Sequence, residues 1–371
     1  MKKQTKENLG LVFGSLLSNK KAVEAGKKLP WWMALISFLL AIFLPVIPTM
    51  VSISKSYGSQ MFKSSNYTYG IDTQLTGVSI DIVKNGYEFK IGDDNRLLAY
   101  KNSTSFSPSV SEDNKPIAQY VNSVTNQIDF EIYYSARLAK GSNNLQNLLD
   151  TISKRQYKVG TKEEGTNEDS KKAKAESSET IKYYTPSFML LYADGILLYT
   201  YKANTTTTNG NTGGNWRHHE KGLNLFDSLT TVKVSDDTTL TAKTGNKDEL
   251  LRNASYINGV FDNWKKSFDL NYLDTKDKSF TYSTLIFLGI YFALSFFMGL
   301  MVFLLTRGKK NVYRYLSFFT CEKINAWASF CPGLLSLILG FMMPNYAVMF
   351  FIALLGLRIM WLSMKELRPQ Y

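Results

Sequence analysis

The chain has 371 residues and a net charge of +12, with 44% hydrophobic and 20% charged residues. Long apolar runs lie toward both ends and the middle is polar, so the mean hydropathy of −0.15 averages over unlike parts. This distribution excludes a simple soluble enzyme, a collagen-like or coiled-coil protein and a disulfide scaffold. It favours an integral membrane protein.

Four segments are apolar and long enough to cross a bilayer, which takes about 20 helical residues. They are residues 31–53, 281–305, 326–343 and 346–364. The first is interpreted as an uncleaved anchor, because it is longer than the apolar region of a signal peptide. We expect Pro45 and Pro48 to bend or end its helix near the far side. Only Pro344 and Asn345 separate the last two spans, which predicts a helical hairpin; a single re-entrant segment is the weaker alternative.

The distribution of charge predicts how the chain is oriented. The segments flanking the spans, together with Arg358 in the last span, hold 15 basic and 4 acidic residues, whereas residues 54–280 hold 28 basic and 27 acidic residues. Because cytoplasmic flanks carry an excess of Lys and Arg, we expect residues 1–30, 306–325 and 365–371 in the cytoplasm and residues 54–280 outside. The chain would then be a multi-pass protein of the cell membrane. The excess positive charge lies next to the predicted membrane spans, where anionic lipid headgroups attract it. It therefore requires no nucleic-acid partner.

One apolar face recurs with helical spacing in the N-terminal segment. Its members are Leu9, Val12, Phe13, Leu16 and Leu17. Lysines flank the face, which predicts a basic amphipathic helix on the inner leaflet. The face either packs on the cytoplasmic ends of the spans, the interpretation we favour, or forms a docking surface for a partner protein.

Residues 54–280 are enough for one domain with its own core. Alternating or apolar runs predict strands at 78–100, around a turn at Asn85-Gly86, and at 128–134, 181–201 and 231–241. Helices are expected at 143–152 and 249–268, and polar low-complexity loops at 160–180 and 203–215. The predicted fold class is therefore an α-helical bundle of about four transmembrane helices with a large extracytoplasmic α+β domain containing an antiparallel sheet.

The sequence predicts no catalytic residue, no cofactor and no metal site. His218 and His219 precede Glu220, but no spaced ligand completes a metal site and adjacent side chains point apart, so we interpret the pair as an exposed loop. Cys321, placed in the inner loop, and Cys331, in the third span, are interpreted as packing residues and not as a redox pair.

The predicted spans are nearly free of ionisable residues. Arg358 lies in the fourth, near its inner end, from which it can snorkel to the interface. The first three have none, which disfavours a proton-coupled transporter. Five glycines suit close helix packing: Gly289, Gly299, Gly333, Gly340 and Gly356. Three polar residues suit hydrogen bonds between helices: Asn325, Ser329 and Ser336.

The plan of the chain resembles a family of uncharacterised membrane proteins of Firmicutes and their wall-less relatives, the Mollicutes, sometimes labelled maltodextrin-utilisation proteins. The resemblance rests on the amphipathic start, Trp31-Trp32 and the two prolines around the anchor, the run 69–73 (Tyr-Gly-Ile-Asp-Thr), the hairpin 190–198 and the C-terminal helical cluster. The family implies no agreed activity and no catalytic residues. This chain departs from it in its larger outer domain and two low-complexity insertions.

Three functions are open at this point. The leading one is a non-enzymatic accessory or sensor subunit of a transport or secretion complex, which binds a partner or ligand through the outer domain and joins other membrane subunits through its spans. The second is a self-contained oligomeric transporter or permease component. The third is a membrane-tethered surface enzyme. Fold alone does not choose among them.

Overall fold

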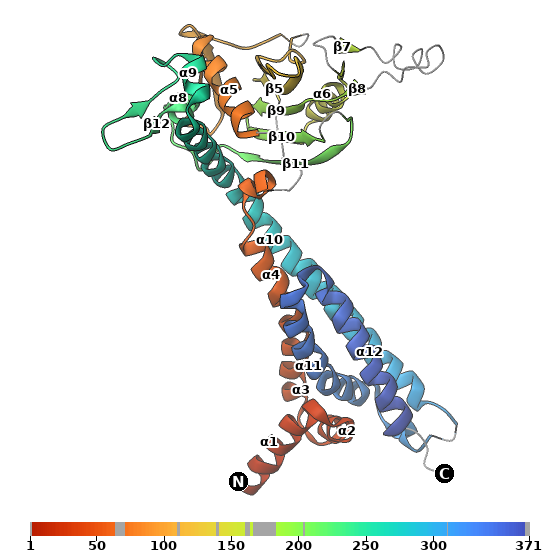
Figure 1. Cartoon of the computed structure of the whole chain (residues 1–371). Coiled ribbons are helices and arrows are strands. Elements are labelled where there is room, and N and C mark those ends of the chain that lie inside the picture. The colour runs from red at the N-terminus through yellow and green to blue at the C-terminus, as the bar shows by residue number, and fades with distance from the viewer. Residues whose placement is uncertain are drawn as a thin grey trace, which may run out of the picture. The chain divides into compact units, whose positions relative to one another are not determined.

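A computed structural model describes residues 2–63, 71–109, 112–138, 141–159, 164–165, 183–202, 205–309 and 311–367. These residues form two compact units. The helical unit comprises Met1–Ser56 and Lys276–Tyr371, and the sheet unit comprises Tyr57–Thr275 (Figure 1).

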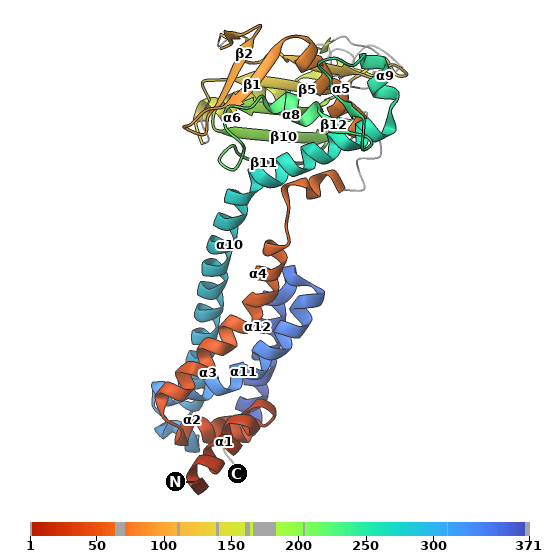
Figure 2. The same cartoon turned by 90° about the vertical axis from the view of Figure 1, so that its left-hand side faces the viewer.

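The helical unit contains four helices long and apolar enough to span a membrane, as predicted. It begins with α1 (Lys2–Leu17) and α2 (Asn19–Lys28). The spans are α3 (Trp31–Phe43) continued by η1 (Leu44–Val46) and α4 (Ile47–Ser54), the second half of α10 (Ala254–Thr306), α11 (Phe318–Met342), and η4 (Pro344–Tyr346) with α12 (Ala347–Lys365). A short helix, η3 (Val312–Tyr315), lies between α10 and α11. Within this unit α11 contacts α2, α3 and α12 (Figure 2).

Two expectations about the helix ends need correction. Pro45 produces only a 3-10 turn, and the helix resumes through α4 to Ser54. Proline is tolerated in the first turn of the new segment, where its missing N–H has no helical partner to lose. The third span begins at Phe318 instead of residue 326. Ser317 caps this start by accepting a hydrogen bond from the Thr320 N–H at 3.2 Å.

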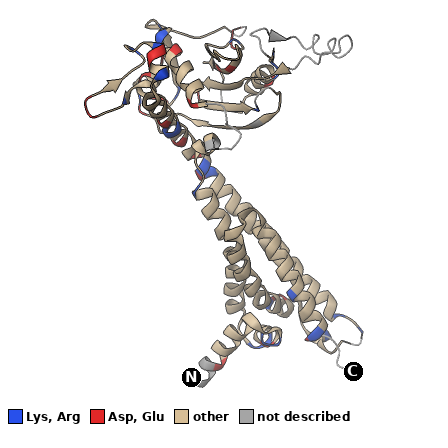
Figure 3. Cartoon of the chain, viewed as in Figure 1, with Lys and Arg blue, Asp and Glu red and all other residues tan. Residues whose placement is uncertain are grey.

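The earlier start of α11 changes the setting of three residues. Cys321 lies in a helix, fully buried, and not in a loop. Glu322 and Lys323 lie in the first turns of the same helix, so this span is not free of ionisable residues. Figure 3 shows charged residues toward both ends of the helical unit, while its helices are uncharged over long stretches in between.

The glycines differ in what surrounds them. A Cβ atom at Gly333 would lie 2.6 Å from the carbonyl oxygen of Ala41 in α3, and one at Gly340 would lie 2.8 Å from Pro48 Cγ. Gly299 lies against the carboxylate of Glu322. Gly289 has open space beside it, and only Met298 Cε, at 3.9 Å, approaches Gly356. Close backbone approach between described helices therefore depends on some of these glycines and not on others.

Two of the three polar residues bridge helices. Asn325 Nδ2 donates to the carbonyl oxygen of Ser295 in α10 at 2.7 Å, and Ser336 Oγ donates to that of Ala347 in α12 at 2.8 Å. Ser329 instead donates to Ala326 within its own helix. Such bonds satisfy polar groups that hydrocarbon cannot.

The sheet unit is mixed α and β. Its helices are η2 (Gly58–Lys63), α5 (Ile71–Lys84), α6 (Asn143–Ser153), α8 (Leu225–Thr230), α9 (Lys247–Arg252) and the first half of α10. Its strands are β1 (Tyr87–Ile91), β2 (Leu97–Lys101), β3 (Thr104–Ser105), β4 (Ala118–Val121), β5 (Ile128–Ser135), β6 (Gln156–Lys158), β7 (Glu164–Gly165), β8 (Tyr183–Tyr184), β9 (Ser187–Tyr192), β10 (Gly195–Tyr201), β11 (Thr208–Asn215), β12 (Val232–Lys233) and β13 (Thr239–Leu240).

A five-stranded sheet in the order β11-β10-β9-β5-β4 is the centre of this unit. Only β5 and β9 pair in parallel; the other neighbours are antiparallel. Alternate side chains of β5 and β9 enter two different cores. Phe130 and Met189 join a core with α5, α8 and α10, whereas Tyr133 and Leu190 pack beneath α6. The sheet is thus covered on both faces, which is why nearly every side chain of β5 and β9 is buried.

Residues 78–84 were predicted as a strand, but they form the end of α5. Ile71, Leu75, Val78 and Ile82 are buried at intervals of four, three and four residues, a helical period that overrides the alternation. Gly86, at φ +73°, follows the helix in a conformation that favours glycine. The hairpin of β1 and β2 turns instead at residues 92–96.

The predicted loop 203–215 contains an edge strand. Residues 208–215 form β11, paired with β10, and Ala203 and Asn204 lie outside the described residues. Its glycines are needed, because a side chain at Gly214 would collide with the backbone of Asn271. The other loop, 160–180, lies outside the described residues except for β7.

Of the remaining predictions for this domain, three are confirmed and two differ in detail. The strand at 128–134, the hairpin about Asp194-Gly195 and the helix at 143–152 are confirmed. The segment 231–241 is a two-stranded hairpin of β12 and β13. The helix expected at 249–268 breaks at Asn253 and then continues to residue 306, so no break occurs at 280.

A buried carboxylate ties three strands together. Glu131 in β5 is 1% exposed, and it accepts hydrogen bonds from Gln119 Nε2 at 2.7 Å, Tyr157 Oη at 2.7 Å and Tyr133 Oη at 2.6 Å. The guanidinium of Arg155 donates to Tyr133 Oη at 3.0 Å. With these donors the group is a satisfied structural network, since each partner offsets the desolvation of the charge.

The glycine contacts predict a difference between two matched substitutions. Gly333→Ala should destabilise the helical unit by about 1–3 kcal/mol, because the new methyl group meets the α3 backbone. Gly289→Ala should leave stability unchanged or raise it by up to about 1 kcal/mol, since it adds only helix propensity. Thermal unfolding of the detergent-solubilised full chain measures both, and equal shifts in Tm would contradict the packing described.

Candidate functional site

The N-terminal helices pack on the third and fourth spans. Helix α2 presents the small residues Ala22, Ala25 and Gly26 to its neighbours, all buried. A side chain at Gly26 would collide with the backbone of Ile324 in α11. The close approach of α2 to α11 therefore requires a residue without a side chain at position 26.

Arg358 joins three elements of the helical unit. Its guanidinium donates to Asn19 Oδ1 at 3.1 Å, to the carbonyl oxygen of Ala328 in α11 at 2.8 Å, and to the carbonyl oxygen of Ser15 in α1. Three of its five N–H donors are therefore used by protein acceptors. Charge-assisted bonds of this kind contribute about 1.5–3 kcal/mol each.

This attachment fixes which side of α1 faces the bundle. Ser15 is buried and Val12 is partly buried, on the side of α11 and Arg358. Leu9, Phe13 and Leu17, spaced four residues apart, are 51%, 66% and 92% exposed. The predicted five-residue face therefore divides. Val12 lies on the packed side, Leu16 is partly buried beside a cleft, and the other three form an exposed apolar stripe.

A cleft of about 590 Å³ opens between α1, α11 and α12. Ser18, Asn19, Arg358, Lys365 and Glu366 line its polar part, and the remaining walls are apolar apart from Cys331. Its lining comes from segments more than 300 residues apart in sequence, so no local motif could predict it.

In the sheet unit, the two histidines have distinct surroundings and are not an exposed pair. His219 is largely buried, with its ring edge-on to that of Trp216 at 5.6 Å between centroids. His218 is partly exposed, and its Nε2 lies 2.8 Å from Asp274 Oδ1 in α10. The two rings therefore have different partners, Trp216 for His219 and Asp274 for His218.

Asp274 is the centre of a small polar cluster. Besides His218, it accepts hydrogen bonds on Oδ2 from Asn215 at 2.9 Å and from Arg217 at 3.2 Å. Burial by itself raises the pKa of Asp274, but the bonds from His218 and Asn215 and the charge of Arg217 outweigh it and hold the pKa below its usual value. No sequence pattern points to Asp274, which lies 56 positions from His218.

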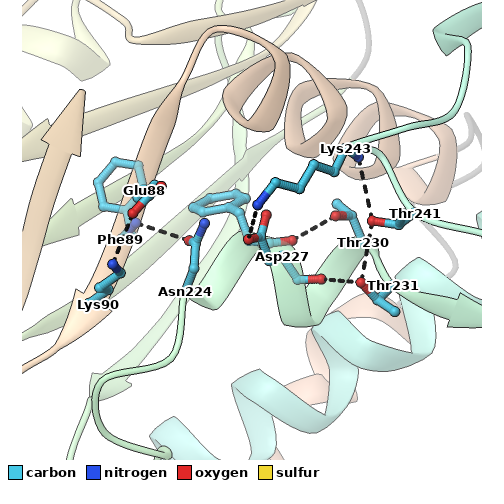
Figure 4. Close-up of polar contacts among 10 residues, drawn as sticks. Glu88, Phe89, Lys90, Asn224, Asp227, Thr230, Thr231, Thr241 and Lys243 are labelled. Carbon is cyan, nitrogen blue, oxygen red and sulfur yellow. Dashed lines mark hydrogen bonds and ion pairs between the residues drawn. The ribbon is translucent and has the colours of Figure 1, made fainter. Parts of the chain in front are cut away.

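A second cleft, of about 360 Å³, adjoins these histidines. One wall is α8, and Figure 4 shows how α8 is held beside β1. Asn224 Oδ1, just before the helix, accepts a hydrogen bond from the Phe89 N–H at 3.1 Å, and Lys243 forms an ion pair of 3.7 Å with Asp227. This wall is thus attached to the sheet unit at both its start and its middle.

Neither cleft carries a recognisable catalytic arrangement. Across the part of the chain that the structure describes, no three His, Cys, Asp or Glu side chains gather as a metal site would require. No family model matches the chain, and neither the curated proteins nor the solved structures yield a match. The function must therefore be argued from the residues alone.

The burial of His219 predicts a pH-dependent stability of its surroundings. Burial lowers the pKa of His219, with bonds to Ser267 and Asn271 opposing the effect. Below its ordinary pKa of about 6.5, the unfolded imidazole binds a proton while the folded one stays neutral. The unfolded state then binds more protons, so stability falls as pH drops below about 6.5.

Hydrogen–deuterium exchange over residues 215–229 tests this locally. Compared with His219→Gln at the same pH, the wild type should lose protection between pH 7.5 and 5.5, while the variant should change little beyond the intrinsic rate. Leu223→Gln, an exposed neighbour on the cleft wall, should keep the wild-type slope. Identical slopes for wild type and His219→Gln would contradict the assignment.

Proposed function

We propose that the protein is a non-enzymatic integral membrane subunit of a transport or secretion complex, which joins its partner through the apolar stripe of α1. The observation that carries the proposal is the exposure of Leu9, Phe13 and Leu17 on a helix whose opposite side is bonded to the spans. A helix fixed in this way cannot turn its apolar stripe inward. The stripe is therefore covered by another molecule.

The charge distribution supports an orientation for this subunit. The flanks of the spans, together with Arg358, hold 15 basic and 4 acidic residues, an imbalance typical of cytoplasmic segments. We propose that both termini are cytoplasmic, that residues 57–275 are outside, and that the α1 stripe acts on the cytoplasmic side. In this arrangement the outer unit is available for a ligand or partner at the cleft beside His219.

Contacts within the spans favour an accessory subunit over a self-contained permease. The polar side chains that bridge helices, among them Asn325 and Ser336, donate to backbone carbonyls of neighbouring helices. Arg358 is likewise bonded to protein acceptors. Polar groups used in this way hold helices together and do not line a continuous path for a solute.

A site-specific photo-crosslinker tests the proposal in the cell of origin. At Phe13 it should give adducts with one membrane protein in stoichiometric yield, because that side chain is central to the exposed stripe. At Val124, which is 91% exposed but lies in the sheet unit, it should not capture that protein.

Two results would count against the proposal. Adducts from Phe13 only with a second copy of the chain would favour the self-contained oligomer, and adducts only with lipid would make α1 a membrane-surface anchor. Replacing Leu9, Phe13 and Leu17 by Gln should abolish co-purification of the partner, whereas Val124→Gln should leave it unchanged.

A further inference from the structure

We propose that the cleft between α1, α11 and α12 binds an anionic phospholipid, with its phosphate at Arg358 and Lys365 and an acyl chain along the apolar wall. The cleft, of about 590 Å³, lies wholly within the helical unit. Its volume suits a headgroup with the upper part of one chain, since ligand sites range over about 300–1,000 Å³.

The charge of Arg358 calls for an anion. Its guanidinium has five N–H donors, of which three are bonded to Ser15, Asn19 and Ala328. All three acceptors are neutral, and none of the described acidic residues forms an ion pair with Arg358. A partly buried cation without a counter-ion is costly, and a phosphate oxygen at the two remaining donors would offset that cost.

The residues of α12 that line the cleft change from apolar to charged along the helix, as the two ends of a lipid molecule do. On one face of α12, Leu354, Leu357, Arg358, Trp361 and Lys365 each lie three or four residues from another of the five. Along about 16 Å of helix, the lining passes from leucine through arginine and tryptophan to lysine. Apolar groups thus lie toward the middle of the span, and two cations, Arg358 and Lys365, with one carboxylate, Glu366, lie toward its end.

The open side of the cleft distinguishes a membrane lipid from a free phosphate compound. Leu357 and Trp361 are 60% and 62% exposed on a span, where acyl chains are the neighbouring solvent. Tryptophan is enriched at the level of lipid headgroups. Opposite them, Ser18 and Asn19 begin α2, so polar groups of the N-terminal helices face the same headgroup region.

The occupant would also connect α1 and α2 to the spans. Leu16 and Leu17 of α1 line the cleft together with Leu335 of α11. A lipid seated there fills the space between these helices and adds an anion beside the guanidinium that already bonds Ser15. Occupancy should therefore stabilise the attachment of the N-terminal helices.

The test uses the full chain, purified and delipidated in a non-ionic detergent, with phosphatidylglycerol as the probe. Native mass spectrometry should show phosphatidylglycerol bound at least about tenfold more tightly than zwitterionic phosphatidylcholine, and thermal unfolding should show a higher Tm only with the former. Inorganic phosphate at the same concentration should give neither effect.

Three variants keep Arg358 and its structural bonds in place. Lys365→Gln should weaken binding by about fivefold, since one cation near a headgroup contributes about 1 kcal/mol. Trp361→Ala should also weaken it, because it removes the apolar wall. Lys20→Gln removes one exposed charge of the adjacent helix outside the cleft and should leave binding within about twofold.

Each other outcome would overturn the proposal. Equal binding of the two lipids would exclude recognition of charge. An equal effect of Lys20→Gln and Lys365→Gln would indicate general attraction to a basic surface, and a Tm rise with inorganic phosphate alone would indicate a simple anion site. Unaltered binding in both Lys365→Gln and Trp361→Ala would place the lipid elsewhere.

Discussion

The need to satisfy one arginine organises the end of the helical unit that carries both termini. Arg358 lies on a helix apolar enough to span a membrane, and a cation there must find acceptors in the protein or reach the interface. It finds them in Ser15, Asn19 and Ala328, on three other segments. Helices α1 and α2 are therefore bonded to the spans, although their sequences alone predict a basic amphipathic segment on the membrane surface.

The sheet unit follows a different constraint. Both faces of its central sheet are covered, so each polar group inside it needs a hydrogen-bond partner. Side chains of β5 alternate between two cores, and its buried carboxylate, Glu131, is retained only with three hydrogen-bond donors. The buried tryptophan side chains also keep a hydrogen-bond partner for their N–H groups. Trp216 donates to the carbonyl oxygen of Tyr192 and Trp264 donates to Ser79, so both indoles are fully buried without loss of a hydrogen bond.

The sequence predicted what depends on composition over a long window and failed where distant contacts decide. Four spans follow from runs of about 20 apolar residues. The start of α11 was missed because residues 318–325 are mixed in polarity, and β11 was missed because an edge strand of Gly, Asn and Thr is held by backbone bonds. The partners of Arg358 lie up to 343 residues away, so a single sequence cannot indicate them, although an arginine in a span does indicate that partners exist.

The attachment of α1 to the spans determines which of its apolar side chains stay exposed. An amphipathic helix free in solution can rotate about its axis and bury its apolar side against whatever is nearest. Here the carbonyl oxygen of Ser15 is bonded to Arg358, so the direction of Leu9, Phe13 and Leu17 is set by the bundle. Exposed apolar stripes of this kind are stable only when lipid or protein covers them. We therefore propose a protein partner for the stripe and a lipid for the neighbouring cleft.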